Sequence, residues 1–137
     1  MTSHVVDASV FGPLFFEDEE DALFDELPML IVEERCVVPQ HWRLEATNQI
    51  LSGLRRKRMT NAMAAKAIAQ IADFPIVVDP ETGARYAEIF ALADQHGLTV
   101  YDAAYLELAI RLRSGLVTYD ADLRSAAAAE RVALLPL

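Results

Sequence analysis

The sequence contains few of the residues that build disulfides and zinc sites. Its 137 residues include one cysteine, Cys36, and three histidines. A single cysteine cannot form an internal disulfide, which is compatible with a reducing compartment. The histidines, His4, His41 and His96, are too scattered to match the ligand spacing of a zinc site. The sequence therefore does not indicate a disulfide-stabilised or zinc-dependent class.

Long apolar runs and leader-like segments are also missing. No apolar stretch approaches the ~20 residues that are needed to span a bilayer. The opening stretch MTSHVVDASV has neither the basic segment nor the apolar run of a secretory signal. No GxxxxGK[ST] run is present to cradle a phosphate group. We therefore expect a cytoplasmic protein that does not associate with membranes.

Basic residues are scarce, with 12 Lys and Arg against 21 Asp and Glu and a net charge of −9. Nine of the acids lie in residues 17–34, which contain no Lys or Arg, and the rest of the chain is balanced. This acidity argues against a protein that coats nucleic acid without sequence specificity, although a nuclease needs only a local basic surface. The run RRKR provides such a surface, and its candidate RNA contacts are Arg55, Arg56, Lys57 and Arg58. The alternative for this run is a solvated helix end that the helix dipole favours.

Short β-branched runs alternate with longer amphipathic stretches along the chain. The pattern predicts strands at residues 4–6, 36–39, 75–79, 116–119 and 132–137. It predicts helices at residues 9–16, 20–35 with a break near Pro28, 40–58, 61–73, 80–96, 98–113 and 121–130. We expect a single domain over residues 1–137, an α/β fold built as a three-layer α/β/α sandwich with a mostly parallel central sheet of about five short strands.

Acidic residues follow several of these apolar runs. Asp7, Asp79 and Asp120 come after the first, third and fourth predicted strands, and Glu45 and Asp102 lie near the starts of helices. In open parallel sheets, functional sites lie at the carboxyl ends of the strands. Taken singly, each acid has a simpler interpretation, as a helix cap, as part of a capping box, or as an acid on a helix face. Independent caps would not need to bring several acids to one edge, so the set as a whole favours a site.

Four blocks in the sequence resemble the motif blocks of the PIN domain, in the same order. They are VVDASV, EATN, TVYDAAYLELA and LVTYDADL, and the last two are the most specific. The similarity extends over essentially the whole chain and is greatest to VapC-type toxins of type II toxin–antitoxin pairs. The resemblance implies a metal-dependent endoribonuclease that uses Mg²⁺ or Mn²⁺, acts on RNA, has a VapB-like antitoxin and often forms a homodimer.

The resemblance also implies roles for individual residues. The four family acids fall on Asp7, Glu45, Asp102 and Asp120. We expect Asp7, Asp102 and Asp120 to bind the metal and Glu45 to position the attacking water or a second ion, because hard cations prefer carboxylate oxygens. Asp79 matches no catalytic position and is interpreted as a helix cap.

Several further residues match positions beside these acids. Ser9 and Thr118 match the hydroxyls beside the first and fourth acids, and with Asn48 they are expected to orient ligands or substrate. Asp122 matches a position that is acidic in only some family members. It is either a further metal or water ligand or a favourable first-turn charge.

Other interpretations remain open at this stage. The first is a PIN-like module with a silent site that acts through protein contacts. A phosphoacceptor receiver would need an acid pair after the first strand and a lysine near the last, and a haloacid dehalogenase-like phosphatase would need Asp-x-Asp where this chain has Asp-Ala-Ser. The apolar residues within the acidic segment form either a groove for a basic antitoxin tail or a face packed on the sheet; they are Leu23, Phe24, Leu27, Leu30 and Ile31.

Overall fold

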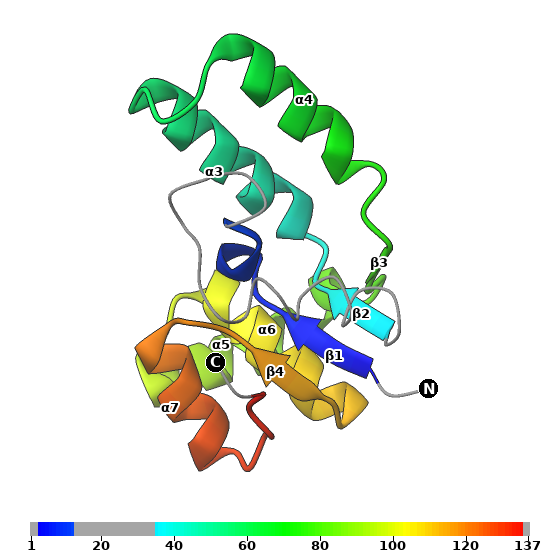
Figure 1. Ribbon diagram of the computed structural model, residues 1–137. Coiled ribbons are helices and arrows are strands. Elements are labelled where there is room, and N and C mark those ends of the chain that lie inside the picture. Colours follow the sequence, from blue (N-terminus) through cyan, green and yellow to red (C-terminus); the bar gives the residue numbers. More distant parts are fainter. Residues whose placement is uncertain (1–2, 13–34, 136–137) are drawn as a thin grey trace.

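A sheet of four short parallel strands forms the centre of the molecule (Figure 1). The computed structural model describes residues 3–12 and 35–135. The strands are β1 (Ser3–Val6), β2 (Arg35–Val38), β3 (Ile76–Val78) and β4 (Gly115–Val117), in the spatial order β3-β2-β1-β4. The chain builds outward from β1 through β2 to β3 and then returns to the other side of β1 with β4. The strand order therefore reverses between β1 and β4, which is where such sheets place their sites.

Within the described residues, five α-helices and two 3₁₀ turns surround the sheet. They are η1 (Ala8–Phe11), α3 (Trp42–Arg55), α4 (Asn61–Ile71), η2 (Thr82–Arg85), α5 (Tyr86–His96), α6 (Val100–Leu112) and α7 (Ala121–Ala129). The α3–α4 hairpin rises above the sheet in Figure 1, whereas α5, α6 and α7 lie below it. The predicted layered α/β fold with a parallel sheet is thus confirmed. None of the described helices is long and apolar enough to cross a membrane.

The ends of the elements differ from the sequence prediction at several places. The predicted fifth strand is reduced to one bridge between Leu116 and Leu134. The helix predicted over 40–58 ends at Arg55, and Lys57 takes a left-handed backbone conformation with φ 60°. The helix predicted from Pro80 begins as the 3₁₀ turn η2. Of the helix predicted over 9–16 the structure shows η1, while the helix predicted over 20–35 and the groove in residues 17–34 lie outside the described residues.

Short sequence signals of the kind that begin and end helices are present at three helix ends. The hydroxyls of Thr60 and Thr99 accept the backbone N–H groups of Met63 and Asp102 at 3.2 and 3.1 Å. Gly97 ends α5 with φ 66°, a left-handed conformation that favours glycine. These local signals fix where α4 and α6 begin and where α5 ends. The first turn of α6, which carries Asp102, is therefore set by a short sequence motif.

The core on which the site rests is apolar and closely packed. Residues 103–109 of α6 are all buried, and α6 packs against β1 and β4. On the α3 side, the Phe11 ring packs edge-on against Trp42 at 5.0 Å and stacks on Phe74 at 5.7 Å. This aromatic cluster joins η1, which follows Asp7, to the first turn of α3. It thereby brings the end of β1 close to the start of the helix that carries Glu45.

Glu81, and not Asp79 as the sequence suggested, is the N-cap residue of η2, and the Asp79 carboxylate is paired with Arg111. The Arg111 guanidinium donates to Asp79 at 2.7 and 3.1 Å and to Glu107 at 2.8 and 3.1 Å. Asp79 also accepts the Thr82 hydroxyl at 2.9 Å. Burial and the hydrogen bonds from Arg111 and Thr82 act in opposite directions, and the net effect lowers the pKa of Asp79. This network ties the end of β3 to the middle of α6.

Replacing Arg111 should therefore destabilise the fold strongly. Arg111→Met would leave Asp79 and Glu107 buried without their cation, and we expect a loss of about 3–5 kcal/mol in the free energy of unfolding. Arg43→Met, at an exposed position on α3, should change it by less than about 0.5 kcal/mol. Denaturant unfolding measures both variants. Equal stabilities would show that the network does not hold α6 to β3.

Candidate active site

Asp7 follows β1 and is almost completely buried, with an exposed fraction of 6%. Its Oδ2 accepts the hydroxyls of Ser9 at 2.9 Å and Thr118 at 2.8 Å. Burial raises the pKa of Asp7, these two hydrogen bonds oppose the rise, and the charge of Glu45 adds to it. Asp7 occupies the N-cap position of η1, but its side chain makes no cap bond to that turn.

Thr118 and Asp120 leave β4 directly beside Asp7. Thr118 was predicted to lie within the strand, but β4 ends at Val117 and the Thr118 hydroxyl turns toward Asp7. The same hydroxyl accepts the backbone N–H of Asp120 at 3.1 Å. Asp120 caps α7, with its Oδ1 accepting the Leu123 N–H at 2.8 Å. The capping interpretation of Asp120 is thus confirmed, and the cap places this acid at the edge that Asp7 occupies.

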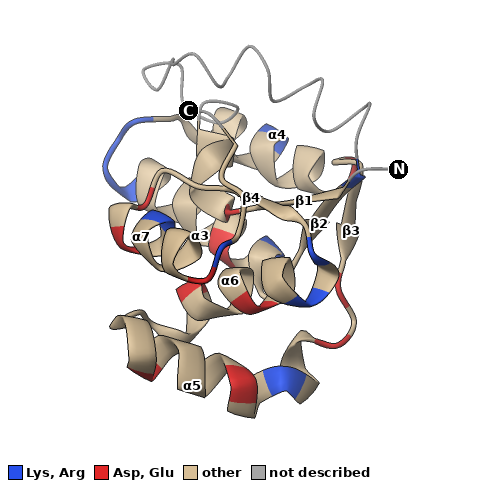
Figure 2. Cartoon of the chain, turned by 90° about the horizontal axis from the view of Figure 1, so that it is seen from below, with Lys and Arg blue, Asp and Glu red and all other residues tan. Residues whose placement is uncertain are grey.

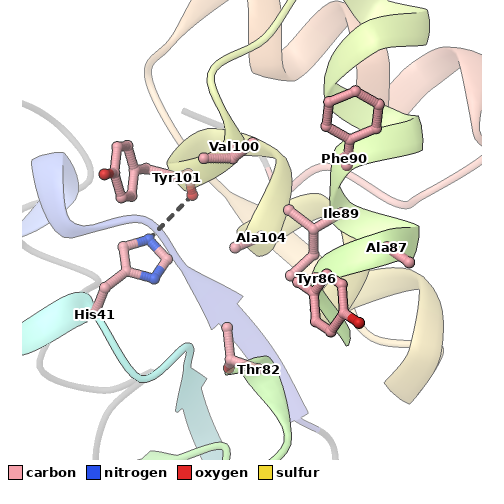
Figure 3. Close-up of a pocket in the computed structure, with 9 residues that line it drawn as sticks. All are labelled: His41, Thr82, Tyr86, Ala87, Ile89, Phe90, Val100, Tyr101 and Ala104. Carbon is pink, nitrogen blue, oxygen red and sulfur yellow. Dashed lines mark hydrogen bonds between the residues drawn. The ribbon is translucent and has the colours of Figure 1, made fainter. Parts of the chain in front are cut away.

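Glu45 lies in the first turn of α3 and makes two polar contacts. The Tyr105 hydroxyl of α6 donates to its Oε1 at 2.6 Å. His41 Nε2 lies 3.2 Å from the same oxygen and donates to the Tyr101 carbonyl at 3.0 Å, a bond drawn in Figure 3. This bond requires a proton on His41 Nε2, because a carbonyl oxygen only accepts. Burial and the Glu45 carboxylate raise the pKa of Tyr105 far above its usual value, so its hydroxyl stays a donor.

Asp102 shows that the four predicted acids share one electrostatic environment. Burial raises its pKa, and the charges of Asp7, Asp120 and Glu45 raise it further. The four acids come from the end of β1, from α3, from α6 and from the start of α7. Figure 2 shows acidic positions on α3, α6 and α7 near the strands of the sheet. The fold therefore collects at one sheet edge the acids that the sequence placed far apart.

The chemistry of this set fits a hard divalent cation. All four groups are carboxylates, and Mg²⁺ and Mn²⁺ prefer oxygen ligands. Burial is the main cause of the raised pKa of Asp102, and repulsion from the other three acids adds to it; a cation would relieve that repulsion. In the described parts of the chain, no three His, Cys, Asp or Glu side chains lie close enough to hold an ion as they stand. Direct binding by all of them would therefore require side-chain rotation or bridging water.

The remaining predicted site residues lie apart from this cluster. Asn48 is exposed on α3, three residues beyond Glu45, and Asp122 is exposed in the first turn of α7. Arg55 to Arg58 are exposed near the far end of α3, about 15 Å along the helix axis from Glu45 at 1.5 Å per residue. The roles suggested for these residues stay predictions.

Sequence reasoning missed three residues that contact the site. His41 and Tyr105 bond to Glu45, and the Arg124 guanidinium donates to the Thr118 carbonyl at 3.0 Å. Each lies three or four residues from a predicted acid: His41 from Glu45, Tyr105 from Asp102, and Arg124 from Asp120. Residues at these spacings share a helix face. That spacing was the available signal, although it does not distinguish a site partner from a core residue.

Comparison with known proteins identifies the family. The model of the PIN domain matches residues 4–129. The chain belongs to the PIN domain family. Ribonuclease VapC3 of Pyrobaculum aerophilum is 29% identical over 123 residues, which cover 87% of this chain and 90% of that protein. The resemblance to VapC-type PIN domains is thereby confirmed.

Solved structures agree with this PIN fold. The crystal structure of PAE2754 from Pyrobaculum aerophilum has a TM-score of 0.71 and 25% identity, and covers 97% of this chain and 83% of that one. VapBC2 from Rickettsia felis, bound to a DNA fragment from its promoter, has a TM-score of 0.66 over 98% of each chain. Its identity of 13% supports the fold alone. The prediction that one domain extends over residues 1–137 stays a prediction.

The mutual repulsion of the acids should be measurable as a pH-dependent stability. The pKa of Asp102 in the fold is raised above its ordinary 3.8, so its ionisation destabilises the metal-free protein as pH rises through the folded value. Asp102→Asn should raise the metal-free melting temperature at pH 7 by about 2–4 °C, a modest gain because Asp102 is only half-buried. The gain should vanish below pH 3.8.

Asp94→Asn provides the matched control for this prediction. Asp94 is an exposed acid on α5, outside the set of charges that act on Asp102. Melting curves with a chelator present should show no pH-dependent gain for this variant. The repulsion would be disproved if both variants behaved alike across the pH range.

Proposed function

We propose that this PIN domain is a metal-dependent endoribonuclease that acts as the toxin of a type II toxin–antitoxin pair. The observation that supports this most directly is the convergence of Asp7, Glu45, Asp102 and Asp120, expressed in the raised pKa of Asp102. The relative named Ribonuclease VapC3 supports the same reaction class. A cytoplasmic location, expected from the sequence, remains part of this proposal.

The mechanism assigns a different task to each acid. A bound Mg²⁺ or Mn²⁺ lowers the pKa of a coordinated water and stabilises the leaving oxygen. Asp7, Asp102 and Asp120 would hold this ion directly or through water. Ser9 and Thr118 fix the orientation of the Asp7 carboxylate by donating to its Oδ2.

Glu45 acts on the attacking water. Its carboxylate comes from the first turn of α3, and its charge acts on Asp7 and on Asp102. The carboxylate accepts a proton from the water or orients that water toward the phosphate. Asn48, one turn further along α3, is placed to contact the substrate. The basic residues 55–58, at the end of the same helix and just beyond it, would contact the RNA backbone, where lysine and arginine neutralise phosphates.

RNA cleavage that depends on a metal and on these acids tests the proposal. Wild type with millimolar Mg²⁺ or Mn²⁺ should cleave RNA and should melt at a higher temperature than with EDTA. Asp7→Asn should lose at least ~100-fold in cleavage rate and most of the metal-induced rise in melting temperature. Sequencing RNA ends after expression of wild type and Asp7→Asn without antitoxin would locate the target.

The control separates a catalytic role of the acids from a structural one. Asp102→Asn should stay folded by circular dichroism and still lose RNA cleavage. If the wild type bound no metal and left RNA intact, the chain would instead be a silent PIN module that acts through protein contacts. Full cleavage by folded Asp102→Asn would remove that residue from the mechanism.

Two protein partners complete the proposal. A VapB-like antitoxin is suggested by relatives solved as VapBC assemblies, such as VapBC2 from Rickettsia felis. A second copy of the chain is suggested by an apolar cavity of about 610 Å³ between α5 and the start of α6 (Figure 3). Tyr86 and Phe90 at this cavity are 75% and 66% exposed, and exposed apolar clusters of this kind mark protein interfaces.

A charge placed on this surface should dissociate the dimer. Phe90→Glu would bury a carboxylate in the apolar contact, and we expect a monomer by sedimentation analysis at concentrations where wild type is dimeric. Leu44→Glu, at a 74% exposed position on α3, should leave the dimer intact. If Leu44→Glu dissociated the dimer and Phe90→Glu did not, the dimer contact would lie on α3 and not on α5.

A further inference from the structure

We propose that Tyr105 is a positioning residue, which fixes the Glu45 carboxylate for its work on the attacking water. This inference rests on the proposed nuclease function and assigns a role to a side chain outside the four-acid set. The Tyr105 hydroxyl donates to Glu45 Oε1 at 2.6 Å. This is a short hydrogen bond to a charged acceptor, and such bonds are stronger than those between neutral groups.

The surroundings of Tyr105 make this bond well defined. The side chain is completely buried, and its ring is part of the core under the site. Tyr105 belongs to α6 and Glu45 to α3, so the bond joins two elements that lie 60 residues apart in the sequence. The hydroxyl that bonds Glu45 is thus carried by α6, the helix of Asp102.

His41 supports the same carboxylate oxygen from a different direction. Its Nε2 lies 3.2 Å from Glu45 Oε1 and 3.0 Å from the Tyr101 carbonyl. Within the described residues, both polar contacts of the Glu45 carboxylate are therefore made to Oε1. The second oxygen, Oε2, is the one available to a water or an ion. Fixing Oε1 in place limits the positions that Oε2 of the same carboxylate can take.

Holding Glu45 in one orientation should matter for rate more than for RNA binding. A glutamate has three side-chain torsions, and a flexible carboxylate near other negative charges would turn away from them toward solvent. Loss of a group that orients a ligand or a catalytic carboxylate typically costs about 10–100-fold in activity or metal affinity. Because Tyr105 is buried beneath the site, its hydroxyl is not placed to contact the RNA itself.

Tyr105→Phe is the informative variant, because it keeps the buried ring and removes only the hydroxyl. We expect kcat for RNA cleavage to fall by about 10–100-fold while KM for RNA stays within about twofold of wild type. A double-mutant cycle with Glu45→Gln shows through which group the hydroxyl acts. If it acts through Glu45, adding Tyr105→Phe to Glu45→Gln should cause no further loss.

A second measurement does not depend on cleavage. Crystal structures of the metal-free wild type and Tyr105→Phe should show the Glu45 carboxylate in one conformer in the former and displaced or in several conformers in the latter. The proposal is overturned if Glu45 keeps its position in Tyr105→Phe, if kcat is unchanged, or if the losses in the cycle add. A wild type that leaves RNA intact would count against the nuclease function, while the crystal structures would still decide the positioning role.

Discussion

The repulsion between carboxylates gathered at one edge of a small sheet is the constraint on which this structure depends. At an effective dielectric constant near 20, two carboxylates about 5 Å apart repel by about 3 kcal/mol. Hydrogen-bond donors around the carboxylates offset part of this repulsion. Ser9 and Thr118 bond Asp7, the amide of Leu123 bonds Asp120, and Tyr105 bonds Glu45. Burial raises the pKa of Asp102, and the charges of the other three acids raise it further.

Helix α6 connects the sheet edge that carries the acids to the packed core of the molecule. Its first turn carries Asp102, its buried middle packs on β1 and β4, and its last turns carry Arg111. The Arg111 pairs with Glu107 and Asp79 fasten α6 to the end of β3, on the other side of the sheet from β4. A single helix therefore both presents an acid and is held in place by an ion-pair network away from the four acids. Such rigid support is what a preorganised site requires.

Local signals in the sequence predicted a large part of the fold, because they do not depend on distant contacts. Thr60, Thr99 and Gly97 marked helix ends that the structure shows at the same places. The family resemblance pointed to Asp7, Glu45, Asp102 and Asp120, whose interaction the structure supports. Where local signals were ambiguous, the prediction failed. Asp79 stands before Pro80, a position typical of a helix cap, but its carboxylate pairs with Arg111, which lies 32 residues away.

The sequence by itself determined the alternation of strands and helices and several helix ends, since these follow from backbone geometry, and its resemblance to the PIN domain pointed to the acids. Only the tertiary structure decided which groups surround each acid. Tyr105 lies 60 residues from Glu45, and Thr118 lies 111 residues from Asp7, so no spacing rule links them. Both contacts exist because β1 lies between β2 and β4 in the sheet, with α6 packed against β1 and β4. Strand order, a property of the whole chain, is what converts scattered acids into one site.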